Sequence, residues 1–194
     1  MDNFDFKAYI ANNPLLKEDE GADINSSQLG SDMSTLANSL DDAIEDQLEK
    51  SEEEEGNNNE ALDPASLLSY ILASNTVVNI LSKQAMKIAK KYEWGKGEEA
   101  ARNIYKFTHE LEEKFKSPIR FIVSKFTKDS QKVKTITNSL FVLFLGYLAF
   151  HAGGSALKYL KQAKLSAGGI AGLKAALKGK DIAATTQDII NDLA

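Results

Sequence analysis

The chain has 194 residues, with 28 Asp and Glu against 23 Lys and Arg, which gives a net charge of −5. This length provides one modest domain with tails. Cysteine is absent and only two histidines occur, so disulfides and thiolate metal sites are excluded, a His-rich metal site is not expected, and we predict no cofactor.

The charge is distributed unevenly. Residues 1–63 carry 18 acidic and 3 basic side chains, and residues 64–194 carry 10 acidic and 20 basic ones. We therefore predict an acidic, largely disordered arm over 1–63 and a basic helical body over 64–194. The arm is either a solvating tail or a segment that folds back on the body. A third reading is that the body meets nucleic acid or anionic lipid.

The first segment combines aromatic and apolar residues ahead of a helix stop at Asn12-Asn13-Pro14. We interpret it as a short N-terminal docking peptide, whose candidate contact residues are Phe4, Phe6, Tyr9 and Ile10. Charged residues interrupt this segment and no apolar core of a signal peptide is visible, which predicts a cytoplasmic start.

Apolar residues then recur every three or four positions and predict an amphipathic helix from about Ser31 to Lys50. They are Leu29, Met33, Leu36, Leu40, Ile44 and Leu48. This helix could dock on the body or on a partner. The Glu- and Asn-rich residues 51–60 that follow are typical of a disordered linker.

Asp63 and Pro64 predict a helix start, with Asp63 as the N-cap. We expect one core helix from Pro64 to about Tyr92, although its uncharged part is also a weak candidate for a membrane span. A second helix is predicted from Glu98 to Lys116. Ser117-Pro118 should end it and begin a short helix over 119–127.

The most apolar stretch is Thr135–Leu157, 23 residues without a formal charge and with lysines on both sides. As a helix it would reach roughly 34 Å, enough to cross the roughly 30 Å core of a bilayer. It is therefore either a membrane span or the central buried helix of a small bundle. We expect this helix to run from near Ser130 to about Lys164.

Small residues share one face of this helix at steps of three, four and seven positions, and such a face lets another helix approach closely. They are Ser139, Gly146, Ala149, Gly153 and Ala156. The expected partner is the helix at 64–92 or the one at 98–116. Gly153-Gly154 could instead simply break the helix. We expect His151 to be satisfied within the bundle rather than to act as a titrating group in a membrane.

The C-terminal part is rich in glycine and alanine. Residues 166–169 are interpreted as a hinge, followed by a helix over 170–178 and a last helix that Asp181 caps and that contains Ile182, Ile189, Ile190 and Leu193.

Catalytic motifs are not recognised. His109-Glu110-Leu111-Glu112-Glu113 lacks the second histidine of a zinc-protease signature, and the glycines at 168–172 do not follow a strand as a dinucleotide fingerprint requires. We predict that the chain is not an enzyme.

Two groups of residues carry a family resemblance. The opening Asn3-Phe4-Asp5-Phe6-Lys7 and the segment Lys114-Phe115-Lys116-Ser117-Pro118-Ile119, followed by Phe126-Thr127-Lys128-Asp129, an apolar helix and a Gly/Ala-rich end, resemble small helical virion-associated proteins of T-even-like tailed phages of marine bacteria. The resemblance covers about half of the chain and contains no catalytic motif. It implies a helical structural or accessory protein of a phage.

A second resemblance concerns processing. Internal head proteins of such phages carry head-targeting peptides that a prohead protease removes after Leu/Ile-x-Glu, and Leu16-Lys17-Glu18 is similar to that pattern.

The predicted fold class is all-α, a small helical bundle around a long apolar helix. The predicted function is a non-enzymatic, virion-associated protein located in the host cytoplasm or the virion, with other phage structural proteins or further copies of itself as partners. The alternative is a small phage protein of the host inner membrane that spans at about 135–157 and is holin-like or membrane-remodelling. Nucleic acid remains a third, weaker partner prediction.

Overall fold

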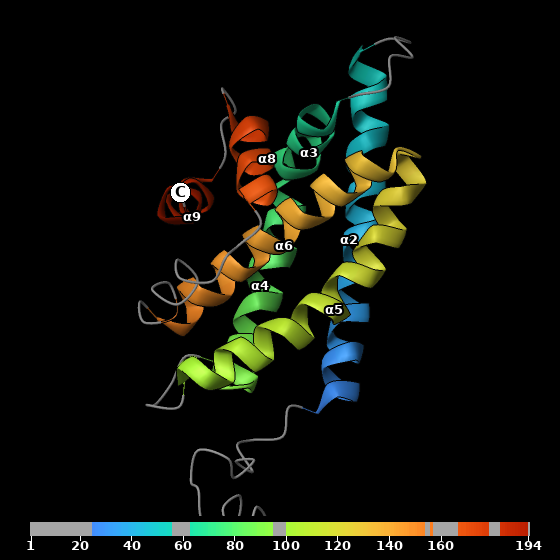
Figure 1. Ribbon diagram of the computed structural model, residues 1–194. Helices are drawn as coiled ribbons and strands as arrows, with labels where there is room; N and C mark the ends of the chain where they lie inside the picture. The colour runs from blue at the N-terminus through green and yellow to red at the C-terminus, as the bar shows by residue number, and fades with distance from the viewer. Residues whose placement is uncertain are drawn as a thin grey trace, which may run out of the picture.

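The computed structural model describes residues 25–55, 63–94, 100–153, 156, 167–178 and 183–193. Within these ranges the chain forms seven α-helices and no strand. The predicted all-α bundle around a long apolar helix is therefore confirmed. Figure 1 shows this helix, α6, crossing the middle of the molecule between the others. The predicted disorder of residues 1–24 and 56–62 falls on positions outside the described residues.

Helix α2, Ser26–Glu55, is longer than the predicted helix at 31–50. It begins earlier because the Asn25 side chain accepts a hydrogen bond from the backbone N–H of Gln28 at 3.0 Å and so caps the helix. It also continues through residues 51–55, where we expected a disordered linker. Its predicted apolar stripe is buried at Leu29, Met33, Leu36, Leu40 and Ile44, and half-buried at Leu48.

Helices α3, Pro64–Ala73, and α4, Asn75–Lys91, replace the single helix predicted here. Asp63 caps α3 as predicted, since its side chain accepts hydrogen bonds from the N–H groups of Ala65 and Ser66. The chain bends by 78° between α3 and α4. Ser74 is extended at the bend, and its hydroxyl accepts a hydrogen bond from the N–H of Val77 at 3.4 Å. Ser74 is thus the N-cap of α4, a signal that our single-helix prediction overlooked.

Helix α5, Ala100–Phe126, continues through Pro118, where we predicted a stop. A proline inside a helix removes one backbone hydrogen bond and costs about 3 kcal/mol or more. Packing offsets this cost, because the apolar residues on both sides of Pro118 belong to one buried stripe: Phe107, Leu111, Phe115, Ile119, Ile122 and Val123. A break at Pro118 would uncover one half of that stripe.

Helix α6, Ser130–Ala152, begins where predicted. Asp129 caps it by accepting hydrogen bonds from the N–H groups of Gln131 and Lys132 at 2.8 and 3.2 Å. The predicted continuation to Lys164 is wrong, because the helix ends at Gly153. The φ of Gly153 is 104°, which favours glycine and turns the chain out of the helix. Residues 141–149 are all buried.

Helices α8, Ala167–Leu177, and α9, Ala184–Leu193, form the C-terminal part. We predicted a hinge at residues 166–169. Residues 167–169 already belong to α8, so the prediction is wrong for these three positions. In α9, Ile189, Ile190 and Leu193 are buried, which agrees with the predicted apolar positions. The predicted cap Asp181 and Ile182 lie outside the described residues.

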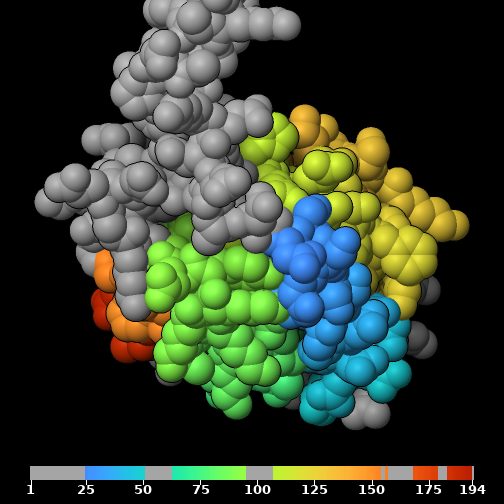
Figure 2. Space-filling view, turned by 90° about the horizontal axis from the view of Figure 1, so that it is seen from below, coloured from blue at the N-terminus to red at the C-terminus, as the bar shows by residue number. Residues whose placement is uncertain are grey.

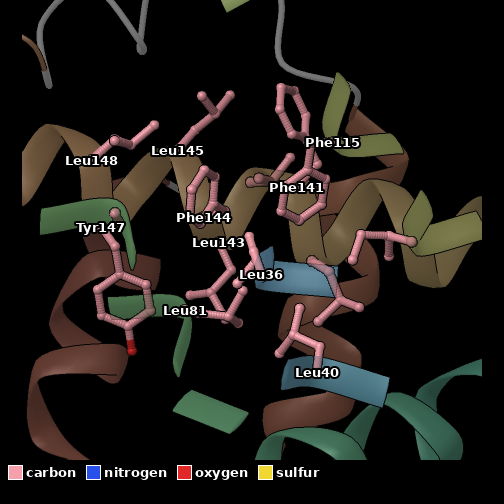
Figure 3. Packing of buried hydrophobic residues seen from close by; sticks show 14 of the residues in the cluster. Leu36, Leu40, Leu81, Phe115, Phe141, Leu143, Phe144, Leu145, Tyr147 and Leu148 are labelled. Atoms are coloured by element: carbon pink, nitrogen blue, oxygen red, sulfur yellow. The ribbon is translucent and has the colours of Figure 1, made fainter. Parts of the chain in front are cut away.

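The core is organised around α6, which packs against α3, α4, α5, α8 and α9. Figure 3 shows α6 side chains pointing to opposite sides, with Leu145 and Leu148 on one side and Tyr147 on the other. On the α5 side, the ring centroid of Phe115 lies 5.4 Å from that of Phe141 and 5.0 Å from that of Phe144. Helix α2 covers α3, α4 and α5 from outside.

The predicted boundary after residue 63 does not separate α2 from the helices that follow, because α2 contributes to the same buried cluster. Ion pairs reinforce this contact: Asp32 lies 2.6 Å from Lys91 of α4, and Asp41 lies 2.5 Å from Lys125 of α5. Figure 2 shows the beginning of α2, in blue, lying directly beside α4, in green. For α2, the reading in which the acidic segment folds back on the basic helices is confirmed.

Shortening a buried side chain of α2 tests whether this helix belongs to the folded core. Leu40 is fully buried, so Leu40→Ala should lower the free energy of unfolding by about 2–5 kcal/mol. Asn38, on the exposed side of the same helix, provides the control, and Asn38→Ala should be neutral or slightly stabilising. Urea melts of both variants measure the difference. Equal stability of the two variants would show that α2 is not part of the folded core.

Candidate functional site

The predicted small-residue face of α6 contacts α8 through Ser139. The Ser139 hydroxyl lies 2.9 Å from the carbonyl oxygen of Thr135 in its own helix and 3.0 Å from that of Gly169 in α8. A Cβ atom on Gly172 would lie 2.5 Å from the Ser139 oxygen and 3.3 Å from Cγ2 of Thr135. Glycine at 172 therefore lets the α8 backbone approach α6.

Gly146 provides the same kind of contact with α9. A Cβ atom added at Gly146 would clash with Cγ2 of Ile189 and would lie 3.1 Å from Cδ1 of Leu193. Ile189 is branched at Cβ, so its methyl group cannot move far without a change of rotamer. The predicted close approach at Gly146 is confirmed, but the partner is α9 and not the helix at 64–92 or 98–116.

One polar contact beside this face was not predicted. The Tyr147 hydroxyl forms a hydrogen bond with the hydroxyl of Thr186 in α9, and both residues are buried. Burial raises the pKa of Tyr147, so the phenol stays protonated at neutral pH. A buried tyrosine usually has a hydrogen-bond partner. From this rule, a polar partner for Tyr147 could have been expected from the sequence.

The remaining residues of the predicted face lie on both sides of the point where α6 ends. Ala149 is buried within the helix, and Ala156 is buried beyond it. Gly153 is wrong as a packing residue, because it is exposed and a Cβ atom there would have no neighbour within 4 Å. Its conformation, rather than close packing, requires glycine. The face is thus composed of Ser139, Gly146 and Ala149, with Gly172 as its counterpart on α8.

His151 lies near the C-terminal end of α6 and faces α4. Its Nε2 atom is 3.2 Å from the hydroxyl oxygen of Ser82, which fits the prediction of a histidine satisfied within the bundle. Burial, and secondarily the positive charge of Lys90, lower the pKa of His151 below its ordinary value of 6.5. The folded protein therefore favours neutral imidazole.

The remaining predicted site lies outside the described residues. These positions are the docking and processing residues Phe4, Phe6, Tyr9, Ile10, Leu16 and Glu18. Within the described part of the chain, no group of three or more His, Cys, Asp or Glu side chains is arranged to hold a metal ion.

Membrane-spanning length is a further property of α6. It is the one described helix that is long and apolar enough by itself to cross a bilayer, and α3 and α4 pass the same test only as a pair bent by 78°. In this fold, however, 72% of the most apolar window of α6 is buried inside the molecule. Its apolar side chains are covered mainly by other helices.

The close contact at Gly146 leads to a stability prediction. Gly146→Ala should lower the free energy of unfolding by about 1–3 kcal/mol, because the new methyl group overpacks the contact with Ile189. Gly168→Ala is the matched control: Gly168 is exposed in α8 with open space around it, so the change should be neutral or stabilising by up to about 1 kcal/mol. Combining Gly146→Ala with Ile189→Ala should cost less than the sum of the single changes. Strict additivity in thermal melts would count against this contact.

His151 leads to a prediction of pH dependence. As pH falls through 6.5, the unfolded chain takes up the proton first, because the pKa of His151 is lower in the folded state. The free energy of unfolding should therefore fall over this range and level off below the folded pKa. His151→Gln should remove this part of the pH dependence, whereas His109→Gln, at an exposed position, should preserve it. Urea melts between about pH 7.5 and 5.5 make the comparison; identical profiles for wild type and His151→Gln would contradict it.

In comparisons with protein-family models, with curated proteins and with solved structures, no match to this chain is found.

Proposed function

We propose that this chain is a non-enzymatic structural or accessory protein of a tailed phage particle, which acts by contact with other phage structural proteins or with further copies of itself. The phage assignment depends on the sequence resemblance at 3–7 and 114–129. The burial of α6 by helices on several sides supports a folded bundle over a membrane-spanning chain.

The helices around α6 also support a folded bundle over a membrane-spanning form. Phe115 and Ile119 of α5 and Leu81 of α4 are all buried, and Phe115 stacks directly on α6. If α6 left the bundle to span a bilayer, these apolar faces would lose their main cover and would need another partner. In the folded bundle they are already covered.

One exposed apolar side chain is a candidate contact for a structural partner. Phe121 on α5 is 70% exposed. Arg120 is exposed beside it, and the Lys125 ammonium lies 6.0 Å from the centroid of the Phe121 ring. Aromatic and arginine side chains are the residue types that most often carry binding energy at protein interfaces.

The membrane protein of the second hypothesis has one specific observation in its favour, the length and apolar character of α6. A carbonate wash of membranes from expressing cells separates the two proposals. The bundle should be released into the soluble fraction, whereas a chain that spans at 135–157 should stay with the membrane.

The particle role is tested by intact-mass analysis of purified particles of the phage that carries this gene. We expect the chain to be present in a constant ratio to the major structural proteins across a density gradient. If the prohead protease acts after Glu18, the particle form should begin at Asp19. Absence from particles, while infected cells contain the chain, would refute the particle role.

A further inference from the structure

One face of α4 carries lysines without a partner among the described residues. Lys83, Lys87 and Lys90 are exposed and follow one another at steps of four and three positions, which places them on one side of the helix. None of the three forms an ion pair within the described ranges, whereas the adjacent Lys91 pairs with Asp32. Figure 2 shows part of α4, in green, at the surface of the molecule beside α2, in blue.

The end of α6 joins this face. The contact between His151 and the Ser82 hydroxyl, at 3.2 Å, fixes the last turn of α6 against α4. Lys90 lies close enough to His151 for its charge to act on the imidazole. The ring of Phe150 lies 5.3 Å from that of His151 and is 52% exposed. Phe150 is thus a large exposed aromatic side chain beside the histidine that fixes α6 against α4.

We propose that this face, formed by Lys83, Lys87 and Lys90 of α4 and Phe150 of α6, docks the protein on an anionic lipid membrane. Each lysine near a negatively charged bilayer surface strengthens binding by about fivefold. In helices that lie in the membrane interface, lysines contact the head groups and apolar side chains such as phenylalanine enter the boundary between head groups and acyl chains.

The charges around the face favour this orientation. Helix α4 contains no acidic residue from Asn75 to Lys91. Asp32, the α2 carboxylate that contacts α4, is neutralised by Lys91. Among the side chains of α2 that the structure describes, the exposed acids are Asp42, Glu45, Asp46 and Glu49, all in the second half of the helix. The exposed Glu93 just after α4 reduces the positive charge at this end by one.

Lipid fits this face better than nucleic acid does. Base recognition combines Arg or Lys with Asn and Gln inside a groove, and single-strand binding uses several stacked aromatic side chains. This face has lysines, which act as point charges, and one phenylalanine. The docking is peripheral: α6 stays buried and the bundle stays folded. It does not depend on the proposed particle role.

The test is flotation of the purified full-length protein with vesicles at about 0.1 M salt, where charges still interact over about 10 Å. One set of vesicles contains phosphatidylglycerol and the other is phosphatidylcholine alone. We expect binding to the first set and little to the second. The Lys83→Gln, Lys87→Gln, Lys90→Gln variant should bind about 100-fold more weakly, and Phe150→Ser should weaken binding further.

Two matched variants control for net charge. Replacing the same three lysines with arginine should preserve binding. Replacing Lys128, Lys134 and Lys174, which are exposed elsewhere, with glutamine should change binding less than twofold. Three results would overturn the proposal: no preference for phosphatidylglycerol, an equal loss in this second triple variant, or displacement from the vesicles by an equimolar amount of DNA, which would assign the face to nucleic acid.

Discussion

The burial of an uncharged helix is the constraint on which the rest of this structure depends. Residues 141–149 of α6 are buried without interruption, and a helix that is apolar all round needs cover on every side. Five helices pack directly against α6. The need to cover α6 explains local features of these helices that residue propensities disfavour. The bend at Ser74 turns α3 so that α3 and α4 both reach α6. The apolar stripe of α5 continues across Pro118 because both halves of α5 are needed in the core. Helix α2 then covers the outer sides of α3, α4 and α5, held by its apolar stripe and by ion pairs at its edges.

The second constraint is the short distance between helix backbones on the side where α8 and α9 pack against α6. Gly146 and Gly172 leave no room for a Cβ atom, so the helix backbones come close and buried polar groups find partners across the contact. Ser139 reaches the carbonyl of Gly169, and Tyr147 reaches Thr186. These contacts satisfy groups that would otherwise cost free energy in the core. They also distinguish this side of α6 from the α5 side, where bulky rings stack.

Much of the fold follows from patterns that are local in sequence. The apolar stripes of α2 and α5, the cap Asp63 and the apolar character of α6 are all visible in the residues themselves. The two main errors have different causes. Ser74 is a residue type that favours helix caps, and our prediction overlooked this local signal. Pro118 is a local signal for a helix stop that tertiary packing overrides. Spacing showed that α6 has a small-residue face, and at Gly146 that was correct. Spacing could not identify which helix approaches that face, nor distinguish the packing glycine at 146 from the terminating glycine at 153.

Native-state hydrogen exchange in buffer without lipid or detergent is the most direct test of the central place of α6. Amides in the most buried helix should exchange only when the whole molecule unfolds. We predict that residues 141–149 exchange most slowly and that their opening free energy equals the unfolding free energy from denaturant melts. Exchange at 141–149 that is faster than in the core-facing positions of α2 and α5 would contradict a bundle organised around α6.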